Sequence, residues 1–238
     1  CSSDLAQKSQ VIAHRGYWKT AGSAQNSITS LQKADSIHCY GSEFDVWLAK
    51  DNKLVVNHDP VYKMKYMEYS KGDALTGLKL SNGENLPSLQ KYLEAGKKCN
   101  TKLILELKAH NSKKRETKAV QEILAMVKKM GLEDRMEYIT FSLHAMKEFI
   151  RLAPAGTPVF YLNGELSPKE LKDLGAAGLD YHMGVIKKHP EWIKEAHDLG
   201  LKVNVWTVDK AEDMKWLIDQ KVDFITTNEP IVAQDMLK

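Results

Sequence analysis

Acidic, basic and imidazole side chains gather in three short stretches of the first half of the chain, and a further histidine, His58, follows the second stretch. The stretches read His14-Arg15-Gly16, Glu43-Phe44-Asp45 and Glu106-Leu107-Lys108. Three carboxylates brought within about 4 Å would repel by about 4 kcal/mol per pair at an effective dielectric of about 20. A bound cation relieves this repulsion, and an all-oxygen donor set favours Mg²⁺ or Ca²⁺ over zinc. We therefore expect Glu43, Asp45 and Glu106 to hold one divalent cation.

The basic and imidazole groups in the same stretches suit an anionic substrate. Arg15 and Lys108 can hold phosphate oxygens while a cation offsets the charge that develops during displacement. An alkoxide is a poor leaving group and needs a proton, and His14 and His58 can supply one general acid and one general base. The competing interpretation is that the carboxylates form ordinary salt bridges with Arg15 and Lys108. The convergence of all these groups at strand ends favours the metal site.

The elements that must position these groups alternate between short β-branched runs and amphipathic helical stretches, as in βα units around a parallel sheet. Strands are expected at Gln10–His14, Gly41–Val46, Lys102–Leu107, Met136–Phe141, Pro158–Leu162, Leu179–His182, Lys202–Trp206 and Asp223–Thr226. Helices are expected near Ala24–Ile37, Ser88–Lys97, Lys113–Met130, Leu143–Leu152, Pro168–Leu174, Pro190–Leu199, Lys210–Asp219 and Pro230–Met236.

Eight strands and eight helices favour an α/β fold of the (β/α)8 TIM barrel type over an open doubly wound sheet. The length of 238 residues suits one such barrel, spanning residues 10–238, and the chain has no GxGxxG or Walker-type glycine loop. Active sites of these barrels lie at the C-terminal ends of the strands, which is where the acidic and histidine stretches fall. Residues two apart on a strand face the same side, so Glu43 and Asp45 are expected to point together.

One segment breaks the alternation after the second strand. Asp51-Asn52 between two apolar runs is typical of a turn and predicts a hairpin extension of that strand. With this dipeptide as the turn, counting outward places Asp45 opposite His58, with Cβ atoms roughly 5 Å apart. Residues 59–87 then form a small insertion, which we expect over the mouth of the site.

The residues that carry this chemistry occur in the order and approximate spacing of a known signature. The relevant segments are His14-Arg15-Gly16, Asn26, Glu43-x-Asp45, His58-Asp59, Glu106-x-Lys108, Val205-Trp206-Thr207-Val208 and Ile225-Thr226-Thr227. They resemble the glycerophosphodiester phosphodiesterase family, and the resemblance covers nearly the whole chain, from Ile12 to Pro230. It implies metal-dependent hydrolysis of glycerophosphodiesters to an alcohol and glycerol 3-phosphate.

The resemblance also implies a role for each site residue. It implies Glu43, Asp45 and Glu106 as metal ligands, His14 and His58 as the catalytic pair, Arg15 and Lys108 as phosphate contacts, and Trp206 beside the alcohol portion of the substrate. In this family a hydroxyl of the substrate's own glycerol can attack phosphorus and give a cyclic phosphate that water then opens. The sequence leaves that route, and the acid or base role of each histidine, open.

Two positions depart from the family pattern. Family members usually read Pro-Glu-Asn-Thr where this chain has Ala24-Gln25-Asn26-Ser27, so Gln25 keeps hydrogen-bonding capacity but lacks a charge. Asn228 stands where an aspartate is commoner. Neither change affects the expected ligands or histidines, so we expect an active enzyme.

Other residues carry weaker signals. Trp206 alone fits barrel packing as well as substrate contact, and Asn204 faces the same way. Phe141 and Tyr161 end strands, where they can form pocket walls or fill the core. His182 is expected to be structural. Four histidines in loops or helices are expected at the surface: His110, His144, His189 and His197.

Charge and composition exclude several function classes. The net charge of +3, from 34 basic and 31 acidic residues, is too small to indicate nucleic-acid binding, and no apolar run approaches the roughly 18 residues that span a bilayer. The start at Cys1, followed by polar residues, resembles the mature end of a bacterial lipoprotein. This predicts an extracytoplasmic enzyme held to the membrane only by a lipid on Cys1, with residues 1–9 as a tether. In that compartment Cys39 and Cys99 can be a disulfide or two buried thiols.

Two rival functions remain open from the sequence. One is a phospholipase D-like or cyclising phosphodiesterase acting on lysolipid, and the other is a non-catalytic lipoprotein that binds glycerophosphodiesters. The preferred head group, the physiological metal and the oligomeric state are also left open.

Overall fold

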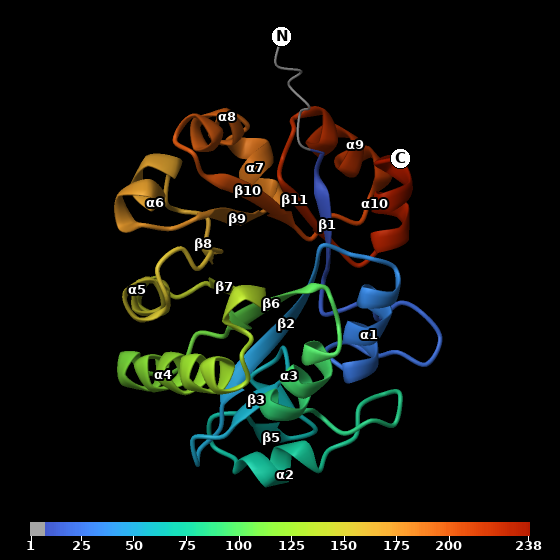
Figure 1. Ribbon diagram of the computed structural model, residues 1–238, viewed down its shortest axis with the longest axis vertical. Coiled ribbons are helices and arrows are strands. Elements are labelled where there is room, and N and C mark those ends of the chain that lie inside the picture. Colours follow the sequence, from blue (N-terminus) through green and yellow to red (C-terminus); the bar gives the residue numbers. More distant parts are fainter. Residues whose placement is uncertain (1–7) are drawn as a thin grey trace.

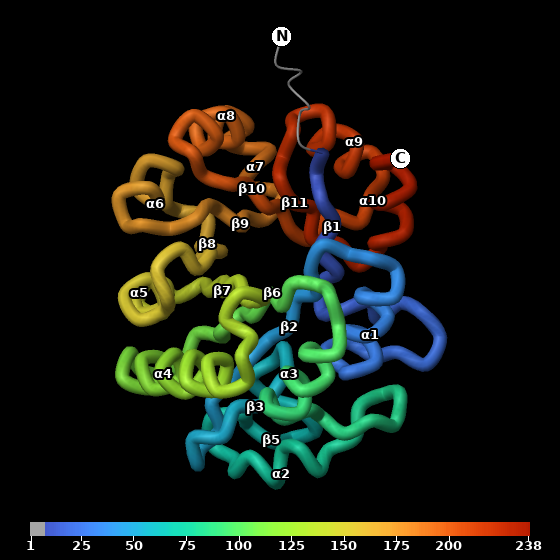
Figure 2. Tube along the Cα trace, viewed as in Figure 1, coloured from blue at the N-terminus to red at the C-terminus, as the bar shows by residue number. Residues whose placement is uncertain are grey.

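Short apolar runs of the sequence form eight parallel strands that close into a barrel in the computed structural model, which describes residues 8–238 (Figure 1). The strands, in ring order, are β1 (Gln10–Ala13), β2 (Gly41–Leu48), β6 (Lys102–Leu107), β7 (Met136–Thr140), β8 (Val159–Tyr161), β9 (Gly178–His182), β10 (Lys202–Trp206) and β11 (Phe224–Thr227). The ring closes because β1 pairs with both β2 and β11, and in Figure 2 the first and last strands lie side by side. The predicted (β/α)8 barrel is confirmed.

Helices surround the barrel in Figure 1. They are α1 (Ile28–Ser36), α3 (Leu89–Lys97), α4 (Lys113–Lys129), α5 (Leu143–Leu152), α6 (Pro168–Leu174), α7 (Met183–Lys188), α8 (Glu191–Asp198), α9 (Ala211–Asp219) and α10 (Pro230–Met236), with a 3-10 turn at Glu133–Arg135. Helices α1, α3, α4, α5 and α6 each follow a serine whose hydroxyl accepts the backbone N–H three residues on. Local sequence therefore determines where many of the helices begin.

Two helices differ from the expectation. Helix α1 begins at Ile28 and not at Ala24, because Asn26 has a positive φ of 58° and Ser27 caps the helix. The short helix α7 was not expected. It follows β9 directly, and His182 accepts the Gly184 N–H through Nδ1 at 2.9 Å, which gives this histidine the structural role we expected.

The hairpin extension is present, but the predicted register is wrong by one residue. Strand β3 (Leu54–Val56) pairs with β2 so that Val46 faces Val56, and the Asn57 N–H donates to Asp45 O at 3.0 Å. Asp45 is therefore opposite Asn57 and not His58. The cause is Asn52, whose φ of 66° places a third residue in the loop between Ala49 and Lys53.

Residues 59–87 form a small layer beside the barrel, at the lower end of Figure 1. They contain β4 (Val61–Tyr62), β5 (Lys65–Tyr66) and α2 (Gly72–Thr76). Met67, Leu75 and Leu86 are buried against Trp47 and Val55 of the hairpin. This apolar cluster anchors the insertion to the hairpin.

The barrel has an inner and an outer core. The inner core consists of Ile12, Ile104, Ile139, Phe160, Leu162 and Phe224, and a larger apolar layer separates the strands from the helices. Tyr161 belongs to the outer layer. Cys39 and Cys99 are buried free thiols, so the structure has the two thiols and not the disulfide that the sequence also allowed.

Two further expectations concern the surface and the membrane. His110 is not a surface residue: its Nε2 accepts the Leu48 N–H at 2.9 Å and its Nδ1 lies 2.6 Å from Lys108 O, so it joins β2 to the loop after β6. None of the helices in residues 8–238 is long and apolar enough to cross a membrane. Cys1 lies outside the described residues, and the lipid anchor stays a prediction.

Candidate active site

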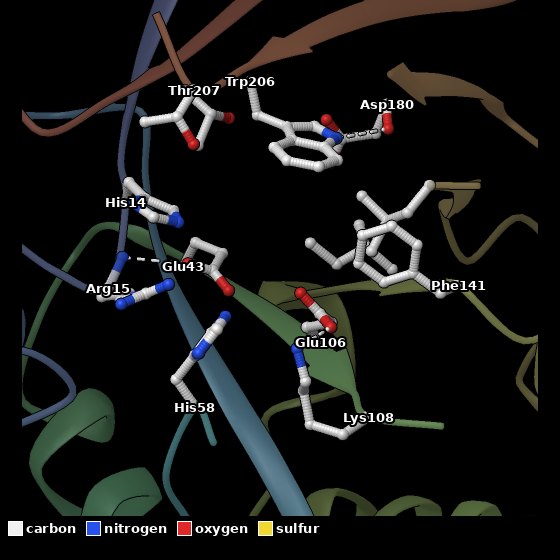
Figure 3. Close-up of a pocket in the computed structure, with 13 residues that line it drawn as sticks. His14, Arg15, Glu43, His58, Glu106, Lys108, Phe141, Asp180, Trp206 and Thr207 are labelled. Carbon is white, nitrogen blue, oxygen red and sulfur yellow. Dashed lines mark hydrogen bonds and ion pairs between the residues drawn. The ribbon is translucent and has the colours of Figure 1, made fainter. Parts of the chain in front are cut away.

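A cavity of about 440 Å³ opens at the C-terminal ends of the barrel strands (Figure 3). It is lined by His14, Arg15, Glu43, His58, Glu106, Lys108, Ile139, Phe141, Leu162, Asp180, Trp206, Thr207 and Thr226. The structure thus brings together seven of the eight residues singled out from the sequence. The eighth, Asp45, is fully buried and belongs to the carboxylate cluster at the edge of the cavity.

The carboxylates meet because two neighbouring strands present them side by side. Glu43 and Asp45 are two residues apart on β2, and Asp45 pairs in register with Glu106 on β6. One oxygen from each of the three groups lies within 4.8 Å of the others, and all three residues are buried. Their acidic, all-oxygen composition fits a hard divalent cation.

One oxygen of Asp45 is held, and the other is left free to bind a ligand. Asn26 donates from Nδ2 to Asp45 Oδ2 at 3.0 Å. Asp45 Oδ1 is buried and has no hydrogen-bond partner among the described residues, with Lys108 Nζ 4.0 Å away. An unpartnered buried carboxylate oxygen is costly, and a cation at this position removes the cost.

The pKa values of the three carboxyl groups also indicate that the cluster favours a bound cation. Burial, followed by repulsion from Asp45 and Glu106, holds the pKa of Glu43 well above its usual value. Burial and then Asp45 raise the pKa of Glu106 to about 8, although Lys108 opposes the shift. Burial also acts to raise the pKa of Asp45, but Lys108 and other neighbours hold it below its usual value. The cluster therefore carries less negative charge than three ionised acids would.

Arg15 and Lys108 lie on opposite sides of the carboxylates in Figure 3. The Arg15 backbone N–H donates to Glu43 Oε2 at 2.9 Å, and its guanidinium donates from Nη1 to Gln25 Oε1 at 2.7 Å. Gln25 therefore orients Arg15 without neutralising it. Lys108 Nζ lies 2.8 Å from Glu106 Oε2, so this ion pair, the competing interpretation of the sequence, coexists with the cluster.

The Arg15 backbone needs a glycine after it. Gly16 has a φ of 76°, and a Cβ on this residue would lie 2.1 Å from Ser30 Oγ. The tight turn allows Ser30 to donate its hydroxyl to Arg15 O at 3.1 Å. This explains why the histidine and arginine at the end of β1 are followed by glycine.

His14 is held in one tautomer by its neighbours. Its Nδ1 lies 2.8 Å from Asn228 Oδ1, and the amide nitrogen of Asn228 donates to Asp209 Oδ2 at 3.0 Å. Because the Asn228 oxygen must therefore be the acceptor, Nδ1 of His14 carries the proton and Nε2 offers a lone pair. Burial, then the charge of Arg15, lowers the pKa of His14, which favours the neutral ring.

His58 reaches the cavity despite the shifted hairpin register. It lies two residues beyond β3, where the chain leaves the ladder, and Trp47 Nε1 donates to His58 O at 3.3 Å. Its Nδ1 lies 2.6 Å from Asp59 Oδ1. In Figure 3 the ring points towards Glu43. One histidine is thus oriented by an amide and the other by a carboxylate.

The opposite wall of the cavity is mainly apolar. Trp206 donates from Nε1 to the backbone oxygen of Asp180 at 2.9 Å and packs edge to face against Phe141. Phe141 lines the cavity, whereas the buried Asn204 accepts a hydrogen bond from Thr226. The Asp180 side chain was missed in the sequence. The available signal was an acid two residues before His182 on the same expected strand.

A second cavity of about 500 Å³ adjoins the first at Arg15 and His58. The insertion contributes Asp59, Tyr62 and residues 80–81 to its walls, and the loop after β1 forms the other side. The insertion therefore borders this outer cavity, whereas none of residues 59–87 lines the central one.

Comparison with known proteins decides the family. The model of the glycerophosphoryl diester phosphodiesterase family matches residues 14–232. The chain belongs to this family. It is accordingly an enzyme, a glycerophosphodiester phosphodiesterase, as the resemblance in the sequence implied.

Individual relatives and solved structures match nearly the whole chain. A crystal structure of a glycerophosphodiester phosphodiesterase from Parabacteroides distasonis is 52% identical, with a TM-score of 0.95 and 97% of each chain covered. A glycerophosphodiester phosphodiesterase from Caldanaerobacter subterraneus is 27% identical over 94% of this chain and 95% of its own length. A phosphodiesterase from Oleispira antarctica, solved with the product sn-glycerol-3-phosphate, shares the fold with a TM-score of 0.82 at 22% identity, over 96% of each chain.

Proposed function

We propose that the enzyme hydrolyses glycerophosphodiesters to an alcohol and glycerol 3-phosphate with one divalent cation, Mg²⁺ or Ca²⁺, held by Glu43, Asp45 and Glu106. The observation that carries the proposal is the convergence of three buried carboxylates with an unpartnered Asp45 oxygen beside two oriented imidazoles. The product in the Oleispira antarctica structure supports the choice of substrate class. When bound, the cation neutralises charge on the phosphoryl oxygens.

The side chains around the cluster bind and orient the diester. Arg15 presents a charged guanidinium that Gln25 holds in place without neutralising it, and Lys108 supplies a second cation at the opposite side. Both can hold non-bridging phosphate oxygens. Trp206 and Phe141 exclude water from the side on which one arm of the diester lies.

The different partners of the two histidines suggest different roles. His14, with a lowered pKa and a free Nε2, suits the base that removes a proton from the attacking hydroxyl. His58, whose Nδ1 lies 2.6 Å from Asp59 Oδ1, is assigned as the acid, because the carboxylate fixes the orientation of its ring. The proton from His58 goes to the departing alkoxide oxygen, and the water or substrate hydroxyl that attacks phosphorus loses its proton to His14.

The test measures release of choline and glycerol 3-phosphate from glycerophosphocholine. Chelation should abolish release, and Mg²⁺ or Ca²⁺ should restore it. Asp45→Asn should lose activity that neither ion restores, whereas Asp173→Asn, at an exposed helical position, should behave as wild type. Full activity of a metal-free preparation would refute the ligand assignment. Exclusive activity on lysolipid would favour the phospholipase D-like alternative.

A further inference from the structure

Asp180 lies across the barrel from the carboxylate cluster. Its strand, β9, is four strands from β2 in either direction around the ring. The side chain lines the central cavity and is 2% exposed. In Figure 3 Asp180 lies beside Trp206, on the far side of the cavity from Arg15 and His58. A substrate whose phosphate lies at the cluster can therefore extend one arm towards Asp180.

The carboxyl group of Asp180 lacks a partner in the described part of the chain. Its Oδ1 is buried without a hydrogen bond, and residues 8–238 provide it with no ion pair within 4.0 Å. The hydroxyl of Thr226, which also lines the cavity, is already used, because it donates to Asn204 Oδ1 at 2.9 Å. An unsatisfied buried polar group costs about 1–3 kcal/mol, which a ligand that completes the hydrogen bonding recovers.

The surroundings favour a neutral ligand group. Ile139, Phe141 and Leu162 form the adjacent walls of the cavity, and an ammonium ion would lose its hydration there at high cost. Burial, and then the nearby charge of Glu137, holds the pKa of Asp180 well above its usual value. A neutral carboxyl group both donates and accepts, and a hydroxyl group matches it.

We propose that Asp180 is a specificity-determining residue that binds the terminal primary hydroxyl of the substrate's glycerol arm. This inference rests on the proposed function, because it takes a glycerophosphodiester as the substrate. The terminal hydroxyl is the group of that arm farthest from phosphorus, which matches the position of Asp180 opposite β2. The hydroxyl donates to one carboxyl oxygen of Asp180 and accepts the proton of the other.

The experiment compares glycerophosphocholine with its analogue lacking only this hydroxyl, 2-hydroxypropyl phosphocholine. Wild type should prefer glycerophosphocholine by about 10- to 100-fold in kcat/KM, since the analogue leaves a buried polar group unpaired. Asp180→Leu should lose this preference, because its kcat/KM should fall on glycerophosphocholine and stay unchanged on the analogue. Asp180→Asn keeps a donor and an acceptor and should retain most of the preference.

Glu116→Gln provides the matched control. Glu116 is a second buried acid, but it accepts hydrogen bonds from the His110 N–H and the Ser142 hydroxyl and does not line the cavity, so this variant should keep the wild-type preference. Equal losses of Asp180→Leu on both substrates would indicate a structural role and overturn the proposal. A fall in the kcat/KM of Asp180→Leu confined to ethanolamine diesters would indicate that Asp180 recognises an ammonium group, and it would also overturn the proposal.

The wild-type comparison separates this inference from the proposed function without any variant. If wild type hydrolyses both substrates equally, the hydroxyl contact is refuted and the proposed function stands. If it hydrolyses neither in the presence of Mg²⁺ or Ca²⁺, the proposed function itself is refuted.

Discussion

Nδ1 of His14 lies 2.8 Å from the side-chain oxygen of Asn228, and this oxygen also accepts the indole N–H of Trp18 at 2.8 Å. The amide nitrogen of Asn228 is committed to Asp209. One neutral side chain thus connects the end of β11 to the end of β1 and fixes the imidazole ring without adding charge to the site.

Replacement of Asn228 by alanine should lower kcat by about 10- to 100-fold, as loss of an orienting partner commonly does. The hydrogen bond that His14 Nδ1 donates to Asn228 Oδ1 raises the pKa of His14, so its loss should move the acid limb of the kcat/KM profile to lower pH. Trp18→Phe removes the other donor to the same oxygen and should have little effect. A limb displaced to higher pH would contradict the base role of His14.

The proposed acid role of His58 predicts a dependence on the leaving group. His58→Ala should lower kcat on glycerophosphocholine by about 10²- to 10⁴-fold, but by less than about 10-fold on a glycerol p-nitrophenyl diester, whose phenolate leaves without a proton. His14→Ala should be equally damaging on both substrates. If the two variants exchange these patterns, the acid and base roles are reversed.

The repulsion within the carboxylate cluster predicts a stability cost in the metal-free protein. Because the folded pKa of Glu43 is raised, this group destabilises the fold above its unfolded pKa, and at pH 7 Glu43→Gln should remove the penalty. We expect the metal-free Tm to rise by about 2–8 °C, measured by calorimetry in chelator. The exposed Glu94→Gln variant is the control. A lower Tm for Glu43→Gln would show that the cluster stabilises the metal-free protein.

His110 predicts a loss of stability in mild acid. Burial lowers its folded pKa, so below about pH 6.5 the unfolded chain binds a proton that the folded protein does not. The free energy of unfolding should fall over that window by up to about 1.4 kcal/mol per pH unit from this group. His110→Gln should show a shallower fall in urea titrations at pH 6.5 and 5.5.

The control for this experiment is His38→Asn, at an exposed position with a positive φ that asparagine tolerates. It should keep the wild-type dependence of stability on pH. If His110→Gln leaves the dependence of the free energy of unfolding on pH unchanged, the His110 ring of the wild type must be protonated in the folded protein. Protonation would break the hydrogen bond that its Nε2 accepts from the Leu48 N–H.

The sequence predicted the barrel, its strands and the convergence of the acidic groups, because alternation of strands and helices determines which ends meet. It did not predict the register of the hairpin. The loop has three residues because Asn52 adopts a left-handed conformation, and its side chain allows a two-residue turn equally well. His58 nevertheless reaches the site, since it lies beyond the end of β3.

Tertiary contacts account for the other differences. His110 was expected at the surface because no local pattern shows that its ring bridges Leu48 and Lys108. Asp180 was overlooked because a single acid in an apolar strand gives no sign of which side of the barrel it faces. The orienting roles of Asn228 and Asp59 also depend on contacts that only the closed ring or the chain path after β3 provides.

In the proposed assignment, residues for bond cleavage and residues for substrate choice lie on different sides of the strand ring. The groups assigned to bond cleavage come from β1, β2, β6 and the hairpin, whereas Phe141, Asp180 and Trp206 come from the semicircle formed by β7, β9 and β10. Evolution can therefore retune which alcohol or polyol is accepted by altering one semicircle, while the hydrolytic apparatus in the other is inherited intact.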